Sequence, residues 1–176
     1  QHKKEDLDKL EMFHYNNGGI SRFEKIKYFY SNILKKELSK EQLSKLIDDF
    51  SKAVYDNLFK KENLILDSYN FIQANHKKYN FHIASGAKED ELKELCKYLN
   101  ISQYFISIYG SPTKKEVLVE EILSKYYYDK NQSILIGDSV ADYHSAYKND
   151  ISFYGYNNPL LKKFNYIDSF NNFLER

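Results

Sequence analysis

Apolar residues recur at helical spacing through the first third of the chain. Two sets keep intervals of one, three and four positions: Phe23, Ile26 and Tyr30, then Leu43, Leu46, Ile47 and Phe50. Residues at these intervals share one face of an α-helix. Because no apolar run typical of a buried strand interrupts them, the pattern predicts that residues 1–62 form a helical module.

Capping signals divide this module into helices. Ser21 with Glu24 three positions later, and Ser39 with Gln42, match the capping-box pattern that opens a helix. The run Asn16-Asn17-Gly18-Gly19 breaks the apolar period before the first of these boxes. The predicted helices cover residues 1–15, residues 21–36 and residues 39 to about 59.

From residue 63 onward, short apolar runs alternate with segments of helical period. The runs that predict strands are residues 81–84, 104–109, 133–136 and 152–155. The segments that predict helices between them are residues 88–99, 115–127 and 142–148. Such alternation is typical of a parallel sheet with crossover helices. We therefore predict an α/β fold in which residues 63–176 form the sheet-containing core.

The composition excludes several classes of partner. The chain has 26 basic and 25 acidic side chains, a net charge of +1, which does not favour nucleic acid or an anionic membrane. Its apolar runs are shorter than the ~20 residues of a membrane span. Cys96 is the only cysteine and has no disulfide partner in the chain, which fits a reducing compartment. We expect a soluble, cytoplasmic protein.

The strongest chemical signal follows the apolar run of residues 133–136. Gly137 permits a sharp turn, and the carboxylates of Asp138 and Asp142 lie four positions apart directly after it. Ligands of parallel sheets bind beyond the carboxyl ends of the strands. Two carboxylates at that edge suit Mg²⁺, which takes one or two of them and keeps several waters. The alternative is a solvated turn with an aspartate helix cap.

Two other predicted strands also end in polar residues. Ser85 and Gly86 follow one, and Lys114 and Lys115 follow the next. A hydroxyl and backbone N–H groups at a helix start bind phosphoryl oxygens, and a lysine neutralises developing charge. Together with the aspartates, these residues describe a phosphate site. Taken singly, the serine is an ordinary N-cap and the lysines an ordinary solvated helix start.

In the order Ser85, Lys115 and Gly137-Asp138-x-x-x-Asp142, the chain resembles the haloacid dehalogenase-like superfamily of Mg²⁺-dependent phosphohydrolases. The resemblance implies a Rossmann-like core with an α-helical cap. It also implies that Ser85 and Lys115 are catalytic residues that bind the phosphate together with Gly86, Lys114 being the other candidate lysine. Asp138 and Asp142 would be the metal site. The implied partner is a small phosphorylated metabolite.

The loop Gly18-Gly19-Ile20-Ser21-Arg22 resembles a cap loop of phosphoglucomutase-like members. In those relatives the matching arginine grips a distal anionic group of the substrate. A planar guanidinium binds phosphate or carboxylate in bidentate fashion, so Arg22 has suitable chemistry. The alternative is a surface arginine that pairs with a neighbour such as Glu24.

One motif of the family has no match in this sequence. Members begin with an apolar strand ending in Asp-x-Asp, which supplies the nucleophile and the general acid and base. Asp6-Leu7-Asp8 has the spacing, but a polar run precedes it, so we assign it to the solvated face of the first helix. The missing strand would be central in the sheet, between the strands that end at Ser85 and at Asp138. We expect it to lie outside this sequence, which by itself would be inactive.

The resemblance thus implies an enzyme that hydrolyses a small phosphomonoester through an aspartyl-phosphate. Two alternatives stay open at this stage. One is a sugar-phosphate mutase of the same family, which the Gly18–Arg22 loop favours. The other is a non-catalytic binding or regulatory domain that keeps the fold without the nucleophile.

Overall fold

The structure is a computed structural model that describes residues 2–175. Its N-terminal part is helical, as the apolar period predicts. The helices are α1 (Lys4–Asn16), α2 (Arg22–Tyr28), which continues into a π-helical turn (Phe29–Ile33), and α3 (Lys40–Leu58). Asp6 and Asp8 both lie within α1, so the Asp6-Leu7-Asp8 run is helical and not the end of a strand.

Both predicted capping boxes are present. In the first, the Glu24 N–H donates to Ser21 Oγ over 3.2 Å, and the Ser21 N–H donates to the Glu24 carboxylate over 3.4 Å. In the second, the Gln42 N–H donates to Ser39 Oγ over 3.2 Å. These bonds satisfy N–H groups that have no partner within a helix, and they therefore fix where α2 and α3 begin.

The remainder alternates strands and helices, in agreement with the predicted α/β class. In chain order the elements are α4 (Leu66–Asn75), β1 (His82–Lys88), α5 (Glu89–Tyr98), β2 (Ser107–Ser111), α6 (Lys115–Lys125), β3 (Ile134–Gly137), α7 (Val140–Lys148), β4 (Ser152–Tyr156) and β5 (Tyr166–Ile167). The prediction started β2 three residues too early, because Ser102–Tyr104 is a 3₁₀ turn in which the Tyr104 N–H donates to the Ile101 carbonyl.

The strands form two parallel sheets. One pairs β1 with β2, and the other has the order β3-β4-β5. Ile83 is opposite Ile108 in the first sheet, and Leu135 is opposite Phe153 in the second. Among the described residues, β1 and β3 each have a strand partner on one side only. On the other side of each, no strand within residues 2–175 pairs with it.

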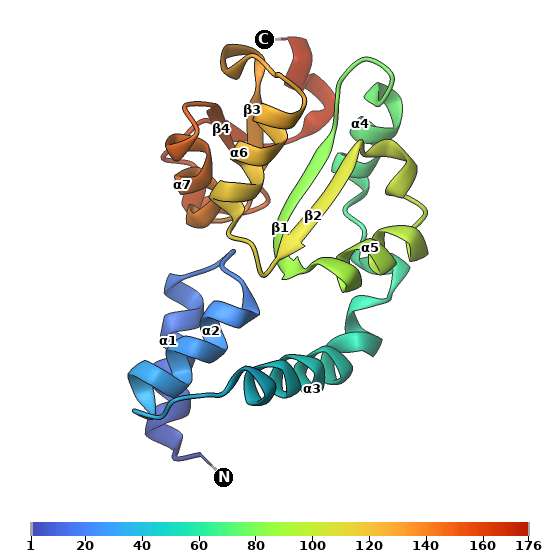
Figure 1. Ribbon diagram of the computed structural model, residues 1–176. Coiled ribbons are helices and arrows are strands. Elements are labelled where there is room, and N and C mark those ends of the chain that lie inside the picture. Colours follow the sequence, from blue (N-terminus) through green and yellow to red (C-terminus); the bar gives the residue numbers. More distant parts are fainter. Residues whose placement is uncertain (1, 176) are drawn as a thin grey trace.

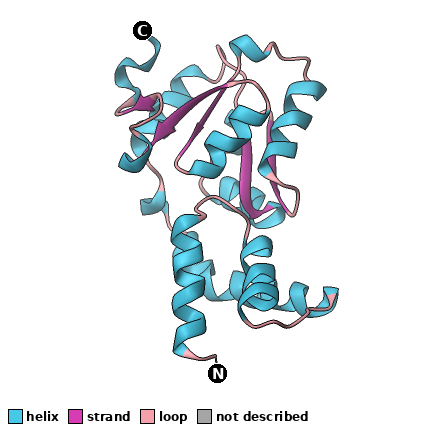
Figure 2. Ribbon diagram, turned by 90° about the vertical axis from the view of Figure 1, so that its left-hand side faces the viewer, coloured by secondary structure: helices cyan, strands magenta, loops and turns pink. Residues whose placement is uncertain are grey.

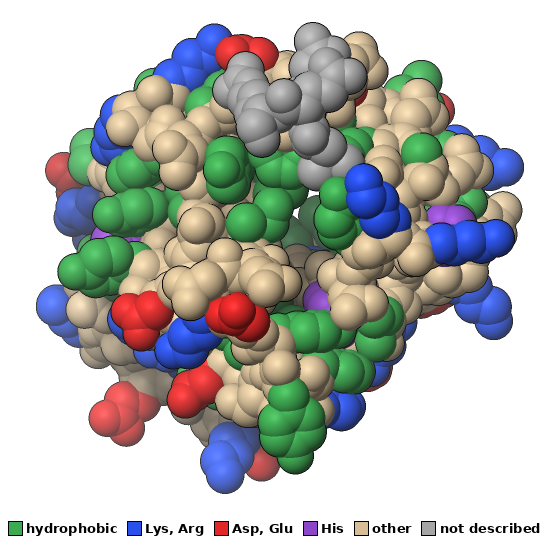
Figure 3. Space-filling model, turned by 90° about the horizontal axis from the view of Figure 1, so that it is seen from above, with side chains coloured by type: hydrophobic (Ala, Val, Ile, Leu, Met, Phe, Trp, Pro, Cys, Tyr) green, Lys and Arg blue, Asp and Glu red, His purple; other side chains and the backbone are tan. Residues whose placement is uncertain are grey.

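On β3, the side without a strand partner goes with an exposed apolar side chain. Ile134 in β3 is 45% exposed, whereas Phe153 in the neighbouring strand β4 is 6% exposed. Figure 3 shows the molecule from the end opposite α1–α3, and hydrophobic side chains surround a hollow near its centre. A parallel strand is normally buried on both faces. The apolar run of β3 is therefore less covered than its composition predicts.

The best-packed part of the core fixes α7 on the second sheet. Ala146 of α7, Phe153 of β4 and Leu161 form a buried cluster, and their exposed fractions are 0%, 6% and 1%. Tyr143 and Phe164 stack against this cluster with ring centroids 4.1 Å apart. Because α7 is anchored in this way, its first turn is held at the carboxyl end of β3.

Helices α1–α3 lie beyond the carboxyl ends of β1 and β2 (Figures 1 and 2). Contacts between α2 and β1 join the helical part to the sheets. The helical part thus covers the sheet edge at which the polar residues of the predicted site occur. Within residues 2–175, no helix combines the length and apolar character needed to cross a membrane.

Candidate functional site

Lys115 and Asp142 meet at the carboxyl edge of the sheets. Lys115 is the first residue of α6, and its Nζ donates to Asp142 Oδ1. The other carboxylate oxygen accepts from the N–H and the hydroxyl of Ser139, over 3.1 and 2.5 Å. A Cβ on Gly137 would collide with the Asp142 side chain, so this close approach requires glycine at the end of β3.

The environment of Asp142 indicates what this residue does. Asp142 is 5% exposed, and the Lys115 side chain is 11% exposed. Both carboxylate oxygens of Asp142 accept hydrogen bonds. A buried carboxylate is stabilised by such pairing. Ser139 and Asp142 also form the capping box of α7. Asp142 therefore orients the lysine and starts the helix.

Asp138 lies in a different environment although it is only four residues away. It is exposed, and within the described part of the chain its carboxylate makes no hydrogen bond or ion pair. Its backbone carbonyl accepts from Asn158 Nδ2 over 2.7 Å, which fixes the turn. Asp138 is therefore the carboxylate of the predicted pair whose oxygens are free.

Mg²⁺ requires oxygen ligands, and carboxylates are the charged ones that a protein supplies. No group of three or more His, Cys, Asp or Glu side chains suited to a metal occurs in residues 2–175. Mg²⁺ in phosphate sites is commonly held by one or two carboxylates, and waters and substrate oxygens complete the octahedron. The free carboxylate of Asp138 fits such a site.

The prediction that Ser85 and Gly86 follow a strand is wrong, because β1 continues to Lys88 and both residues lie in its irregular part, between Ala84 and Lys88. The loop between α1 and α2 packs against Gly86 and connects it with the region of Asp142. A Cβ on Gly86 would be 2.7 Å from the carbonyl oxygen of Gly19, and a Cβ on Gly19 would be 2.7 Å from Ser139 Cβ. Gly19 therefore lies between the end of β1 and the start of α7. Ser85 Oγ accepts from the Ala87 N–H over 3.1 Å. In the described residues no hydrogen bond joins Ser85 to Lys115, Asp138 or Asp142.

Arg22 has an internal partner. Its guanidinium donates to Glu91 of α5 and to Ser51 of α3, both over 2.7 Å, and lies 4.9 Å from the Phe50 ring centroid. The Arg22 and Glu91 side chains are 12% and 9% exposed. Lys114 is 63% exposed and lies 3.9 Å from Glu24, so Lys115 is the lysine that faces Asp142.

Two residues of the site were not predicted. Ser139 positions Asp142, and its spacing of three residues is the capping-box signal that also marks Ser21 and Ser39. That signal was available in the sequence. Glu91 binds Arg22 across 69 positions, and no local pattern predicts such a pairing.

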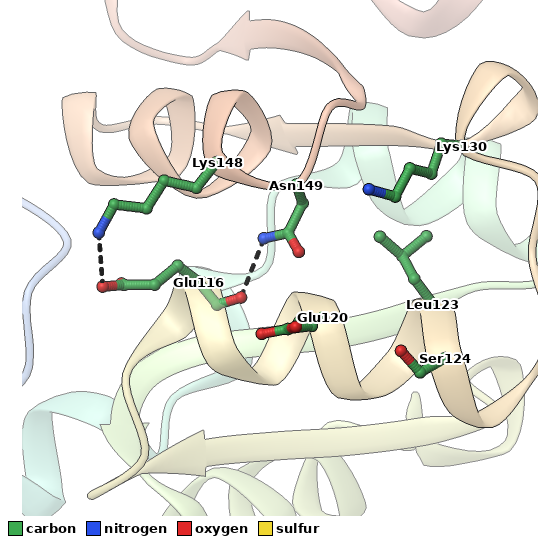
Figure 4. A pocket seen from close by; sticks show the side chains of 7 residues that line it. All are labelled: Glu116, Glu120, Leu123, Ser124, Lys130, Lys148 and Asn149. Atoms are coloured by element: carbon green, nitrogen blue, oxygen red, sulfur yellow. Dashed lines mark hydrogen bonds and ion pairs between the residues drawn. The ribbon is translucent and has the colours of Figure 1, made fainter.

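A cavity of about 390 Å³ lies between α6 and α7, away from these groups (Figure 4). It is lined by Glu116, Glu120, Leu123, Ser124, Lys130, Lys148 and Asn149. Lys148 pairs with Glu116 over 3.0 Å, and Asn149 donates to the Glu116 carbonyl over 2.9 Å. These contacts join the two helices. The cavity shares no residue with the site at the sheet edge.

Comparison with known proteins shows which family has this sequence pattern. A family model described as haloacid dehalogenase-like hydrolase matches residues 9–156, which include the Lys115–Asp142 contact and Asp138. The chain belongs to the haloacid dehalogenase-like hydrolase family. A search of curated proteins gave no match.

Solved structures of this family share the fold. β-Phosphoglucomutase from Clostridium difficile has a TM-score of 0.73 at 17% identity, over 94% of this chain and 77% of its own. A predicted phosphatase from Clostridium acetobutylicum has a TM-score of 0.68 at 17% identity, over 92% and 81%. The HAD-hydrolase YfnB from Bacillus subtilis, bound to magnesium, has a TM-score of 0.60 at 13% identity, over 96% and 81%.

Some relatives are considerably longer than this chain. It spans 61% of a haloacid dehalogenase-like hydrolase from Streptococcus pneumoniae, with a TM-score of 0.54 and 20% identity. At such identities the likeness establishes the fold of this haloacid dehalogenase-like chain.

Proposed function

We propose that this chain supplies the phosphate- and magnesium-binding groups of an enzyme that hydrolyses a small phosphomonoester. The observation that carries the proposal is the pairing of Lys115 with buried Asp142 beside Asp138, whose carboxylate is free. One acidic residue orients a cation, and the other is available to a metal. The magnesium-bound relative and the phosphatase relative support the same chemistry.

Each group has a distinct role in this proposal. Lys115 offsets negative charge on the phosphoryl oxygens, and Asp142 with Ser139 fixes the direction of its ammonium group. Ser85 and the N–H of Gly86 bind another phosphoryl oxygen from the irregular part of β1, between Ala84 and Lys88. Asp138 would hold Mg²⁺, which supplies further charge neutralisation when bound.

We propose that the attacking aspartate comes from a β-strand outside this sequence. The free edges of β1 and β3 support this idea, because a strand between them would join the two sheets. A carboxylate at its end would attack phosphorus and release the alcohol, and water would then release inorganic phosphate. Residues 1–62 would act as a cap over this reaction, since α2 and the Gly19 loop lie against the end of β1.

Substitution of Asp138 tests the proposal. In the protein expressed from its complete reading frame, Asp138→Asn should lower the magnesium-dependent turnover of p-nitrophenyl phosphate roughly 100-fold, since a metal ligand is lost. Asp150→Asn is the matched control, because Asp150 is an exposed carboxylate that pairs with Lys130 at the surface. Equal rates in the two variants would contradict the assignment. Phosphate binding without turnover would indicate a non-catalytic domain.

A sugar-phosphate mutase is the second candidate, because β-phosphoglucomutase has the same fold. The products separate the two reactions. A mutase with a sugar phosphate and a bisphosphate activator yields an isomer, whereas a phosphatase releases inorganic phosphate. We expect inorganic phosphate as the main product.

A further inference from the structure

Lys25 of α2 has a histidine as its hydrogen-bond partner. Its Nζ lies 3.0 Å from Nδ1 of His14, in the last turn of α1. Within residues 2–175, no carboxylate lies at ion-pair distance from Lys25, whereas Lys88 and Lys115 each pair with an aspartate. An ammonium group only donates, so Nδ1 of His14 accepts and the imidazole is neutral in this contact. Lys25 is therefore held by a base instead of by a counter-ion.

The surroundings of Lys25 favour its uncharged form. The side chain is partly buried, and burial lowers the pKa of the Lys25 amine because it disfavours the charged form. A paired carboxylate would oppose this effect, and none pairs with Lys25 among the described residues. Near neutral pH, a larger fraction of Lys25 is therefore free amine than of an exposed lysine. The free amine is the nucleophilic form of lysine.

His14 is placed to take a proton from this amine. A general base has to lie within hydrogen-bond reach of the proton that it removes, about 2.6–3.2 Å between heavy atoms. The Nζ–Nδ1 distance of 3.0 Å meets this condition. His14 is exposed, so a small reagent can approach the pair from solvent. Lys25 and His14 thus combine a nucleophile, a base and access.

We propose that Lys25 is a modification site for small acyl phosphates, with His14 as its general base. The uncharged Nζ attacks the carbonyl carbon of the acyl group. The bond from this carbon to the phosphate oxygen breaks, and inorganic phosphate leaves with the bonding electron pair. One proton passes from Nζ to Nδ1 of His14 and then to solvent, and the product is a neutral amide. This site is separate from the proposed function and does not depend on it.

The modification changes the charge of the helical part close to the sheets. His14 and Lys25 belong to the two helices that the Gly18–Gly19 loop joins. Gly19 in this loop packs against Ser139 and Gly86. Acylation replaces the Lys25 ammonium group by an amide, and it therefore removes one positive charge from the helix pair that holds this loop.

Reaction with acetyl phosphate tests the proposal. The protein from its complete reading frame is incubated with acetyl phosphate without Mg²⁺, so that a magnesium-dependent phosphatase does not consume the reagent. Tandem mass spectrometry of the peptides then measures the rate of acetylation at each lysine. Lys25 should react at least about tenfold faster than Lys27, which is exposed on the same helix and whose ammonium group has no histidine partner among the described residues.

His14→Gln separates the base from the burial of the lysine. Glutamine can still accept a hydrogen bond from Lys25, but it cannot take the proton. The substitution should therefore remove most of the advantage of Lys25 and leave the rate at Lys27 unchanged, which also shows that the reagent and the fold of α2 are unaffected. Acetylation of Lys25 no faster than that of Lys27 in the wild type would overturn the proposal. A fast reaction at Lys25 that persists in His14→Gln would overturn the role of His14.

Discussion

Asp138 and Asp142 illustrate how the environment assigns different roles to identical side chains. Asp142 is buried, holds Lys115 and caps α7 through Ser139, whereas Asp138 is exposed and its carboxylate is free. Their spacing in the sequence predicted a shared place at the end of β3, but it gave no basis for separating them. The difference depends on Lys115, which arrives from another helix.

Truncation of Asp142 should therefore have a large effect on stability. Asp142→Ala leaves Lys115 largely buried without its partner, and we expect a loss of about 3 kcal/mol in the free energy of unfolding. Asp168→Ala is the comparison, because the Lys162–Asp168 pair is 56% and 73% exposed and such pairs contribute about 0–1 kcal/mol. Urea denaturation measures both. Equal losses would show that Lys115 is not held by a buried ion pair.

The elements were predictable where a local signal marks them. The capping boxes fixed the starts of α2 and α3, and the apolar runs located β1, β3 and β4. The bounds of helix α4 were not predicted, because no side chain caps its first residue and the start signal that marks α2 and α3 is therefore absent there. Strand β5 has only two residues, too few for a recognisable run.

The α1–α2 loop is the element whose role depends most on tertiary packing. Gly19 has a φ of +82° and lies against Ser139, so an added Cβ would be strained and would collide. Gly19→Ala should lower the free energy of unfolding by about 1–3 kcal/mol. At Gly18 the nearest atom to an added Cβ is 3.9 Å away, so Gly18→Ala should have little effect. Thermal denaturation of both variants checks this, and equal shifts would contradict the packing of the loop.

The molecule is built from two sheets whose ends carry complementary halves of the proposed site. Ser85 and Gly86 belong to the β1–β2 sheet, whereas Asp138 and Asp142 follow β3 of the other sheet. The sequence predicted this convergence, since carboxyl ends of parallel strands share an edge. It did not predict that Arg22 would be bound by Glu91, because that contact depends on how α2, α3 and α5 pack together.

Convergence of the metal and the phosphate at one edge is the claim on which the proposed function depends. It can be measured by ³¹P NMR of inorganic phosphate bound to the protein from its complete reading frame, with Mn²⁺ in place of Mg²⁺. We expect protein-bound Mn²⁺ to broaden the phosphate resonance strongly in the wild type and in Asp150→Asn, and much less in Asp138→Asn. Broadening that is unchanged by Asp138→Asn would show that the metal and the phosphate do not meet at the end of β3.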